Sequence, residues 1–312
     1  MIQVDILLRE DQIAKDFLDA LARHDLPEKF FYWSPLSIRA WMNLCGDGEY
    51  RNYVRSHSVL QKNAAEIVSI LPAEPIELIS LGSGQGTKDF LIMEHLQNQG
   101  KFLNYRPVDA SQGLLEIACQ SAKKKNFACR GLKADLNNDY HFTEMQSILD
   151  EKPRLIIMLG NTLGAFDPIK FATKLNNIMR PQDFLILDGE LFNQNDTLAG
   201  YDNPINRQFA FGPLSSVGLS EPNDGRLEIK TDVDNRQPGL YRIRKHFQAS
   251  RDLKIILAGE TLQILPEANI EMSWSYKYDR DALTGLITSS GLHLAAEYLS
   301  EDKRFLTLLV KK

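Results

Sequence analysis

Residues 77–90 read ELISLGSGQGTKDF, and this stretch decides the fold that the sequence predicts. Its first five residues form a short, mostly apolar run that is typical of a buried parallel strand. Gly82, Gly84 and Gly86 then permit a tight turn in which the backbone comes close to a ligand. Helical spacing from Thr87 onward places free backbone N–H groups at the same point. The pattern indicates a nucleotide-type binding loop. A purely structural turn also fits, because the third glycine comes one residue early for the dinucleotide pattern.

Polar residues follow the strands that are expected after this loop. Strand candidates at 105–109, 127–133 and 154–159 lead to Asp109, Asp135 and the pair Asn161 and Thr162. The carboxyl ends of parallel strands meet at one edge of a sheet, where ligands of open α/β sheets bind. A carboxylate at such an end can accept hydrogen bonds from both ribose hydroxyls. The series therefore predicts a site for an adenosine-containing cofactor, although each acid alone also fits a solvated loop or a helix cap.

Composition narrows the class of protein. The chain has 312 residues, of which 43% are hydrophobic and 25% charged, as in an ordinary soluble globular protein. A formal net charge of -5 disfavours a nucleic-acid or membrane-surface partner. Three cysteines without C-x-x-C spacing suggest a reduced, cytoplasmic protein, and the charged residues near the start are unlike a signal peptide. No sequence motif for a metal site occurs, so we expect no metal.

The pattern of elements predicts three parts. Residues 1–72 are helical and rich in aromatic side chains. Residues 73–192 alternate strands and helices and, together with residues 276–312, form a Rossmann-like parallel sheet with helices on both faces. Residues 193–275 carry candidate antiparallel strands, which indicate an inserted, β-rich substrate-binding domain over the cofactor edge. These strands are expected at 226–234, 240–250, 253–258 and 260–264.

Two enzyme classes use this edge of the sheet for an adenosine cofactor. The early third glycine disfavours a nicotinamide dehydrogenase, which nevertheless stays open as an alternative. Asp135 favours a class I S-adenosylmethionine (SAM) methyltransferase, because the adenine amino group needs an acceptor after the third strand. A final helix at 279–290 and strands at 292–299 and 305–310 would close the sheet with an antiparallel hairpin, as in that fold.

Short motifs along nearly the whole chain resemble the ergothioneine-pathway histidine Nα-methyltransferases. These are LPEKFFY at 26–32, EY at 49–50, the glycine loop with Lys88, PVDAS at 107–111, ADL at 134–136, LGNTLG at 159–164, YD at 201–202 and SYKY at 275–278. No single motif is specific. Their order and spacing together carry the resemblance.

The resemblance implies a role for each matching residue. The cofactor would be SAM, with its methionine part near Gly82, its carboxylate at Lys88 and its ribose at Asp109. Asp135 and Leu136 would flank the adenine. The remaining cofactor-binding positions are Ser83, Gly84, Ser111, Asn161 and Thr162. The substrate wall would consist of Tyr32, Tyr50 and Tyr201. A surface position for Lys88 and a core position for Tyr32 are the alternatives.

Two substrate-reading positions depart from the family. Ala165 stands where the family has an Asn that contacts the substrate amino group, and Ser273 stands where it has a Glu that reads imidazole. A hydrogen bond to a charged group contributes about 1.5–3 kcal/mol. We therefore expect a substrate other than histidine. Glu271 and Asp202 are the candidates for a replacement carboxylate, beside Ser275.

The predicted reaction is an in-line transfer of the SAM methyl group to the amine of an amino acid or a related small molecule. The protein would contribute alignment and exclusion of water. Tyr50, Tyr201 and Asp202 would organise the amine and accept its proton. The alternative from another class is a SAM-binding sensor or partner module that has lost catalysis.

Overall fold

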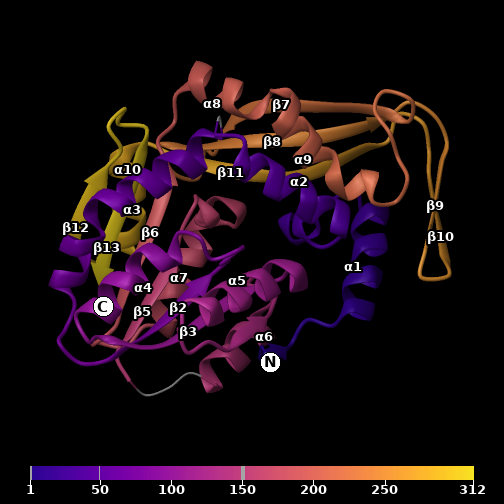
Figure 1. Cartoon of the computed structure of the whole chain (residues 1–312). Helices are drawn as coiled ribbons and strands as arrows, with labels where there is room; N and C mark the ends of the chain where they lie inside the picture. Colours follow the sequence, from indigo (N-terminus) through magenta and orange to yellow (C-terminus); the bar gives the residue numbers. More distant parts are fainter. Residues whose placement is uncertain (1, 49, 149–151) are drawn as a thin grey trace.

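The computed structural model describes residues 2–48, 50–148 and 152–312. Its centre is an eight-stranded sheet in the order β1-β4-β3-β2-β5-β6-β13-β12 (Figure 1). The strands are β1 (Val4–Ile6), β2 (Ile76–Leu81), β3 (Phe102–Asp109), β4 (Gly131–Lys133), β5 (Arg154–Met158), β6 (Phe184–Glu190), β12 (His293–Leu299) and β13 (Phe305–Lys311). β1 to β6 pair in parallel, whereas β13 runs antiparallel to both β6 and β12. The predicted sheet and its closing hairpin are confirmed.

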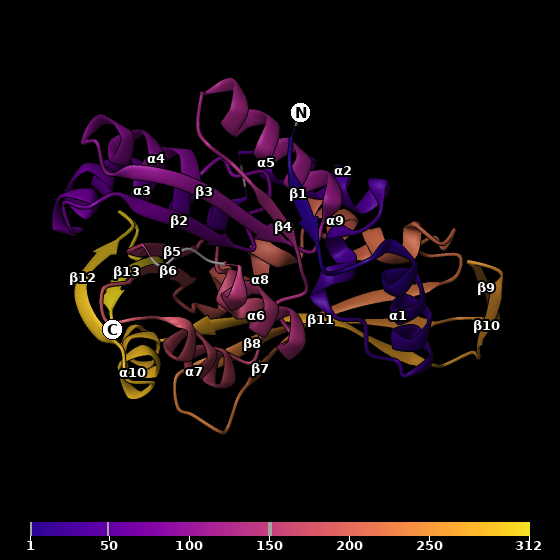
Figure 2. The same cartoon turned by 90° about the horizontal axis from the view of Figure 1, so that it is seen from below.

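Helices cover both faces of this sheet (Figure 2). One face carries α3 (Arg51–Ile70), α4 (Asp89–Asn98) and α5 (Gln112–Lys124). The other face carries α6 (Asp139–Ser147), α7 (Pro168–Ile178) and α10 (Arg280–Ser289). Every residue of β2 and β5 is buried, which explains their nearly continuous apolar sequences. Among the described residues, no helix has the length and apolarity needed to cross a bilayer.

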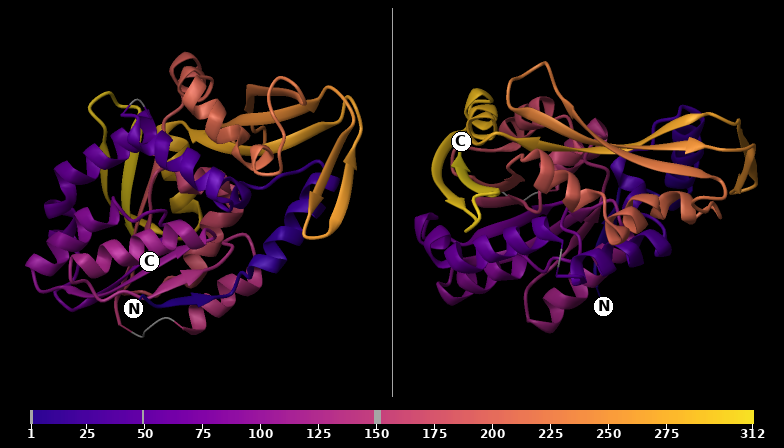
Figure 3. Two further views of the ribbon diagram at one scale, coloured as in Figure 1. Left: turned by 45° about the vertical axis from the view of Figure 1, so that its right-hand side comes forward. Right: turned by 90° about the horizontal axis from the view of Figure 1, so that it is seen from above.

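A cap lies over the carboxyl ends of the parallel strands (Figure 3). Its three-stranded antiparallel sheet has the order β11-β8-β7, and a separate hairpin lies beside the N-terminal helix α1. The cap strands are β7 (Gly225–Val233), β8 (Leu240–Ala249), β9 (Leu253–Leu257), β10 (Glu260–Ile264) and β11 (Asn269–Tyr278). The remaining elements are the helices α1 (Glu10–Ala22), α2 (Pro35–Gly46), α8 (Gln194–Tyr201) and α9 (Pro204–Ser215), and the 3-10 turns η1 (Glu28–Tyr32) and η2 (Thr162–Ala165). The cap has an apolar core of its own, to which both the N-terminal residues and the insert contribute.

β11 is absent from the sequence prediction, and a β-bulge explains why. Ile270 and Met272 are buried at alternate positions, but the alternation breaks at Ser273. Ser273 has a φ of 66°, and the pairing with β8 shifts register between Glu271 and Trp274. A positive φ is uncommon for a residue other than glycine, and bulges of this kind redirect side chains. Here the bulge accompanies a contact between the Ser273 hydroxyl and η1.

The glycine loop is supported from beneath by a buried Tyr–Asp contact. The hydroxyl of Tyr105 on β3 donates a hydrogen bond to Asp89 Oδ2 in the first turn of α4, at 2.5 Å. A Cβ atom on Gly86 would lie only 2.9 Å from that hydroxyl, so a larger residue would displace the loop or the tyrosine. Burial raises the pKa of Asp89 to about 6. The loop is therefore fixed to the sheet at the expense of burying a carboxylate.

Asp89→Asn tests this buried ionisation. A raised pKa means that the folded protein holds the proton more tightly than the unfolded chain. Ionising Asp89 therefore lowers stability as the pH rises from about 4 to about 6. Asparagine still offers an oxygen to Tyr105 but does not ionise. The free energy of unfolding of the variant, minus that of the parent, should increase by roughly 2–3 kcal/mol between pH 4 and pH 7. Urea unfolding at several pH values measures it, and a difference that stays constant with pH would contradict the assignment.

Candidate active site

A pocket lies where the carboxyl ends of the parallel strands meet the cap. Of the predicted cofactor-binding residues, nine line it: Gly82, Ser83, Gly84, Lys88, Asp109, Asp135, Leu136, Asn161 and Thr162. Of the predicted substrate-binding residues, Tyr32, Tyr50, Ala165, Tyr201 and Ser275 line it as well. The pocket thus brings together the glycine loop and residues that lie far from it in the sequence.

Four predicted residues lie outside this lining. Ser111 is buried behind it, where its backbone N–H donates to Asp109 Oδ1 at 2.9 Å. Asp202 is 47% exposed and accepts a hydrogen bond from Arg207. Glu271 forms an ion pair with Arg244 at 2.9 Å. The positions of Asp202 and Glu271 do not agree with the predicted role of these two acids in holding the substrate amine. Ser273 is connected to the pocket through Glu28, which accepts its hydroxyl. Glu49 of the EY motif lies outside the described residues.

The floor of the pocket is shaped by the glycine loop and Asp109. The backbone N–H of Gly84 donates to Asp109 Oδ2 at 2.8 Å, which ties the loop to the end of β3. Gly82 has a φ of 69°, and a Cβ atom there would lie 2.6 Å from the Thr162 methyl carbon. Burial raises the pKa of Asp109. The result is a narrow backbone cradle beside a carboxylate.

Lys88 brings a positive charge to the same floor. Its Nζ lies against Gly160 at the end of β5, so that a side chain at position 160 would collide with it. The Nζ is also 5.6 Å from the centre of the Tyr53 ring. Within the described part of the chain, no hydrogen bond or ion pair satisfies this ammonium group. Lys88 is therefore available to a ligand carboxylate.

The far end of the floor is tied to the N-terminal turn η1. Lys29 Nζ donates to Asp135 Oδ2 at 2.9 Å and to Asp16 at 2.8 Å. Burial opposes the charge on Lys29, but the two carboxylates together raise its pKa. Asp135 Oδ1 also accepts the backbone N–H of Asn137 at 2.9 Å. Asp135, which is predicted to lie at the adenine, therefore lines this end of the pocket, and Lys29 beside it was not foreseen.

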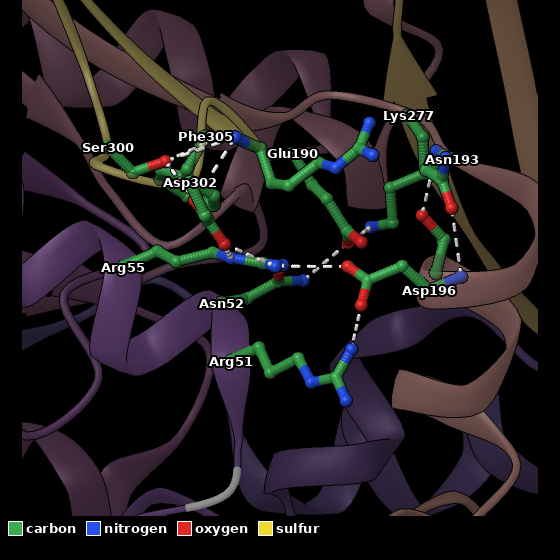
Figure 4. A network of polar contacts seen from close by, with 12 residues as sticks. Arg51, Asn52, Arg55, Glu190, Asn193, Asp196, Lys277, Ser300, Asp302 and Phe305 are labelled. Carbon is green, nitrogen blue, oxygen red and sulfur yellow. Dashed lines mark hydrogen bonds and ion pairs between the residues drawn. The ribbon is translucent and has the colours of Figure 1, made fainter.

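A buried polar network holds one wall of the pocket (Figure 4). Lys277 has no exposed side-chain surface, and burial lowers its pKa. Its Nζ lies 2.8 Å from Tyr201 OH, 2.7 Å from Ser275 Oγ and 3.2 Å from Glu190 Oε2. Asn52 Nδ2 donates to the same Glu190 oxygen at 2.7 Å. The network fixes the orientation of Tyr201 and Ser275, whose hydroxyls are hydrogen-bonded at 3.1 Å.

A second cluster beside this network holds α8 on α3 (Figure 4). Arg55 contacts Asp196 at 2.9 Å and Asp302 at 2.6 Å, and Arg51 also pairs with Asp196. Asn193 caps the start of α8 by accepting the backbone N–H of Asp196 at 3.0 Å. Because α8 ends at Tyr201, these ion pairs help to set the position of that ring.

Aromatic rings form another part of the pocket wall. Trp41 lies 5.2 Å from Tyr32, 5.9 Å from Tyr50 and 5.4 Å from Phe209, measured between ring centres. Burial raises the pKa values of Tyr32 and Tyr50 well above the ordinary value for a phenol. The phenols therefore stay neutral and can donate hydrogen bonds. Their ring faces suit a positively charged group, which each would stabilise by about 0.5–2 kcal/mol.

Glu28 is the carboxylate that sequence reasoning missed. It lines the pocket from η1 and lies within the LPEKFFY motif. Glu28 Oε1 accepts the Tyr32 hydroxyl at 3.0 Å, and Oε2 accepts the Ser273 hydroxyl at 2.5 Å. An acid within a dense aromatic patch was the only signal in the sequence.

The sequence-family model of the SAM-dependent, histidine-specific methyltransferases matches residues 13–312 of this chain. The chain belongs to this family. The predicted resemblance is confirmed, and the protein is a SAM-dependent methyltransferase with SAM as its cofactor.

Individual relatives are distant. A histidine N-alpha-methyltransferase from Mycobacterium tuberculosis is 24% identical over 277 residues, covering 86% of this chain and 84% of that protein. A 4-dimethylallyltryptophan N-methyltransferase, easF, from Aspergillus fumigatus is 23% identical over 313 residues, covering 94% of this chain and 91% of that protein. Among solved structures, a SAM-dependent methyltransferase from Clostridium acetobutylicum has a TM-score of 0.43 and 14% identity, covering 83% of this chain and 91% of that one.

The pocket floor fits SAM. The cradle at Gly82 would be filled by any Cβ atom, Asp109 offers a carboxylate to a ribose, and the Lys88 ammonium lacks a partner among the described residues. When bound, SAM supplies a methyl group activated by a sulfonium. In the three described segments, no group of three or more His, Cys, Asp or Glu side chains is arranged to hold a metal ion.

Lys88→Met should weaken SAM binding by about 10- to 100-fold, because a hydrogen-bonded charge contributes about 1.5–3 kcal/mol. Calorimetric titration with SAM gives the Kd. Lys170→Met is the matched control, since Lys170 is exposed and away from the pocket. A change below twofold in Lys88→Met, or an equal change in both variants, would show that Lys88 does not hold the cofactor.

Proposed function

We propose that the enzyme transfers the SAM methyl group to the amine of an amino acid or a related small molecule, and that histidine is not its preferred substrate. The observation that carries the proposal is the Glu28 carboxylate, placed among Tyr32, Tyr50 and Tyr201 in the pocket that also contains the cofactor cradle. A negative charge enclosed by aromatic rings suits an ammonium group.

Glu28 is the residue best placed to receive the amine proton. An ammonium group must lose a proton before its nitrogen can act as a nucleophile, and a carboxylate within hydrogen-bond reach can accept it. Glu28 uses one lone pair of each oxygen for Tyr32 and Ser273, and a carboxylate has about four. Tyr50 and Tyr201 enclose the amine and exclude water. We assign to Glu28 the proton-accepting role that the sequence assigned jointly to Tyr50, Tyr201 and Asp202.

The preference for another substrate rests on two positions. Ala165 lines the pocket with a methyl group, so it offers no hydrogen bond to a substrate amino group. Ser273 directs its hydroxyl to Glu28. The relatives named above methylate different compounds, histidine in one case and a tryptophan derivative in the other. A change of substrate within this family is therefore ordinary.

Glu28→Gln should lower kcat/KM for amine methylation by about 10- to 100-fold, because the amide keeps the shape but not the charge. The Kd for SAM should stay within about twofold of the parent, since Glu28 does not contact the cofactor cradle. Glu271→Gln is the matched control, because Glu271 pairs with Arg244 outside the pocket. Release of S-adenosylhomocysteine across a panel of amino acids and amines provides the assay.

Two outcomes would count against this assignment. Equal losses in Glu28→Gln and Glu271→Gln would mean that the charge matters for structure alone. Binding of SAM by the parent protein without turnover of any panel member would favour the sensor module over the enzyme.

A further inference from the structure

Lys245 is a buried cation in the substrate half of the pocket that the reaction described above does not use. It lies on β8 opposite Ile229 of β7, and both residues line the pocket. Its side chain is 5% exposed. The Nζ lies 4.6 Å from the centre of the Phe31 ring and 3.9 Å from Glu28 Oε2. In the described part of the chain, this Nζ donates no hydrogen bond.

Among the residues that the structure describes, none accepts a hydrogen bond from this ammonium group. Buried charges are normally both paired and hydrogen-bonded, because removing them from water costs several kcal/mol. At 3.9 Å, Glu28 Oε2 is too far away to accept a hydrogen bond from Nζ. Burial lowers the pKa of Lys245, while Glu28 opposes that change. A ligand in the pocket can provide the missing acceptor.

The other lysines of this region are engaged elsewhere. Lys29 is paired with Asp135 and Asp16, and Lys277 is surrounded by Glu190, Tyr201 and Ser275. Lys88 lies at the cofactor cradle. Lys245 lies on β8 of the cap sheet, which lies over the carboxyl ends of the parallel strands (Figure 1), and it lines the pocket beside Glu28. An acceptor bound by Lys245 therefore belongs to the substrate.

Glu28 and Lys245 form a pair of opposite charges whose nearest atoms are 3.9 Å apart. An ammonium nitrogen and a carboxylate oxygen on one α-carbon are roughly 3 Å apart, by standard backbone dimensions. We propose that the substrate is an amine that also carries a carboxylate, and that Lys245 binds this carboxylate while Glu28 faces the amine. The inference rests on the proposed function and makes Lys245 a residue that determines specificity.

The test compares amino acids with their decarboxylated amines: histidine with histamine, tyrosine with tyramine, and phenylalanine with phenethylamine. The parent enzyme should favour the carboxylate-bearing member of each pair by about 10-fold or more in kcat/KM. Lys245→Met should lose this preference, and Lys245→Arg should keep most of it. Lys230→Met, an exposed position on β7, is the control and should behave as the parent.

Aspartate and glutamate, compared with asparagine and glutamine, distinguish the source of the carboxylate. A preference for the acidic pair that disappears in Lys245→Met assigns Lys245 to a side-chain carboxylate. Equal use of both pairs, with loss of all four in Lys245→Met, assigns it to the α-carboxylate. A parent enzyme that treats acids and amines alike overturns the inference, and so does a Lys245→Met variant that loses both equally.

Calorimetric binding of the same compounds in the presence of S-adenosylhomocysteine separates this inference from the proposed reaction. Carboxylate-dependent binding that Lys245→Met abolishes supports the inference even without turnover. Turnover that ignores the carboxylate leaves methyl transfer standing and overturns the role of Lys245. Failure of every carboxylate-bearing compound to bind overturns it too.

Discussion

A charge removed from water needs a partner, and the junction of the cap with the sheet is built on this constraint. Glu190 ends β6 of the sheet, and Lys277 lies on β11 of the cap; each is almost fully buried, and they meet at 3.2 Å. Separating them would leave two buried ions unpaired, which costs about 3–5 kcal/mol in comparable cases. The pair therefore holds the cap at one position over the cofactor edge. Lys277 also donates hydrogen bonds to Tyr201 and Ser275, so the pair positions these two side chains.

The sequence was sufficient for the features that depend on local patterns. The glycine loop, the acids at the ends of β3 and β4 and the closing hairpin were all predicted. These features depend on the periodicity of apolar residues and on turn residues, and both are visible within short stretches of sequence. β11 was not, since the bulge at Ser273 interrupts the alternation that identifies a strand. The three-residue β1 is too short to have a period at all.

The carboxylate of the site could not be located from the sequence, because its role depends on distant partners. Glu28 and Ser273 are 245 positions apart, and only the folded cap brings them together. Asp202 and Glu271 had suitable chemistry and neighbouring motifs. Their arginine partners, Arg207 on α9 and Arg244 across the strand pair, keep both acids elsewhere. At Ser273, where the resemblance implied a glutamate, this chain has a hydroxyl that donates to a glutamate from η1.

The turn η1 has one further consequence, because Glu28 and Lys29 are consecutive. Glu28 faces the substrate half of the pocket, while Lys29 is bonded to Asp135 at the opposite end. A ligand that moves Glu28 and a ligand that moves Lys29 would therefore act on the same five-residue turn. Any coupling through the turn is reciprocal, so that occupancy of one half changes affinity in the other by the same factor in both directions.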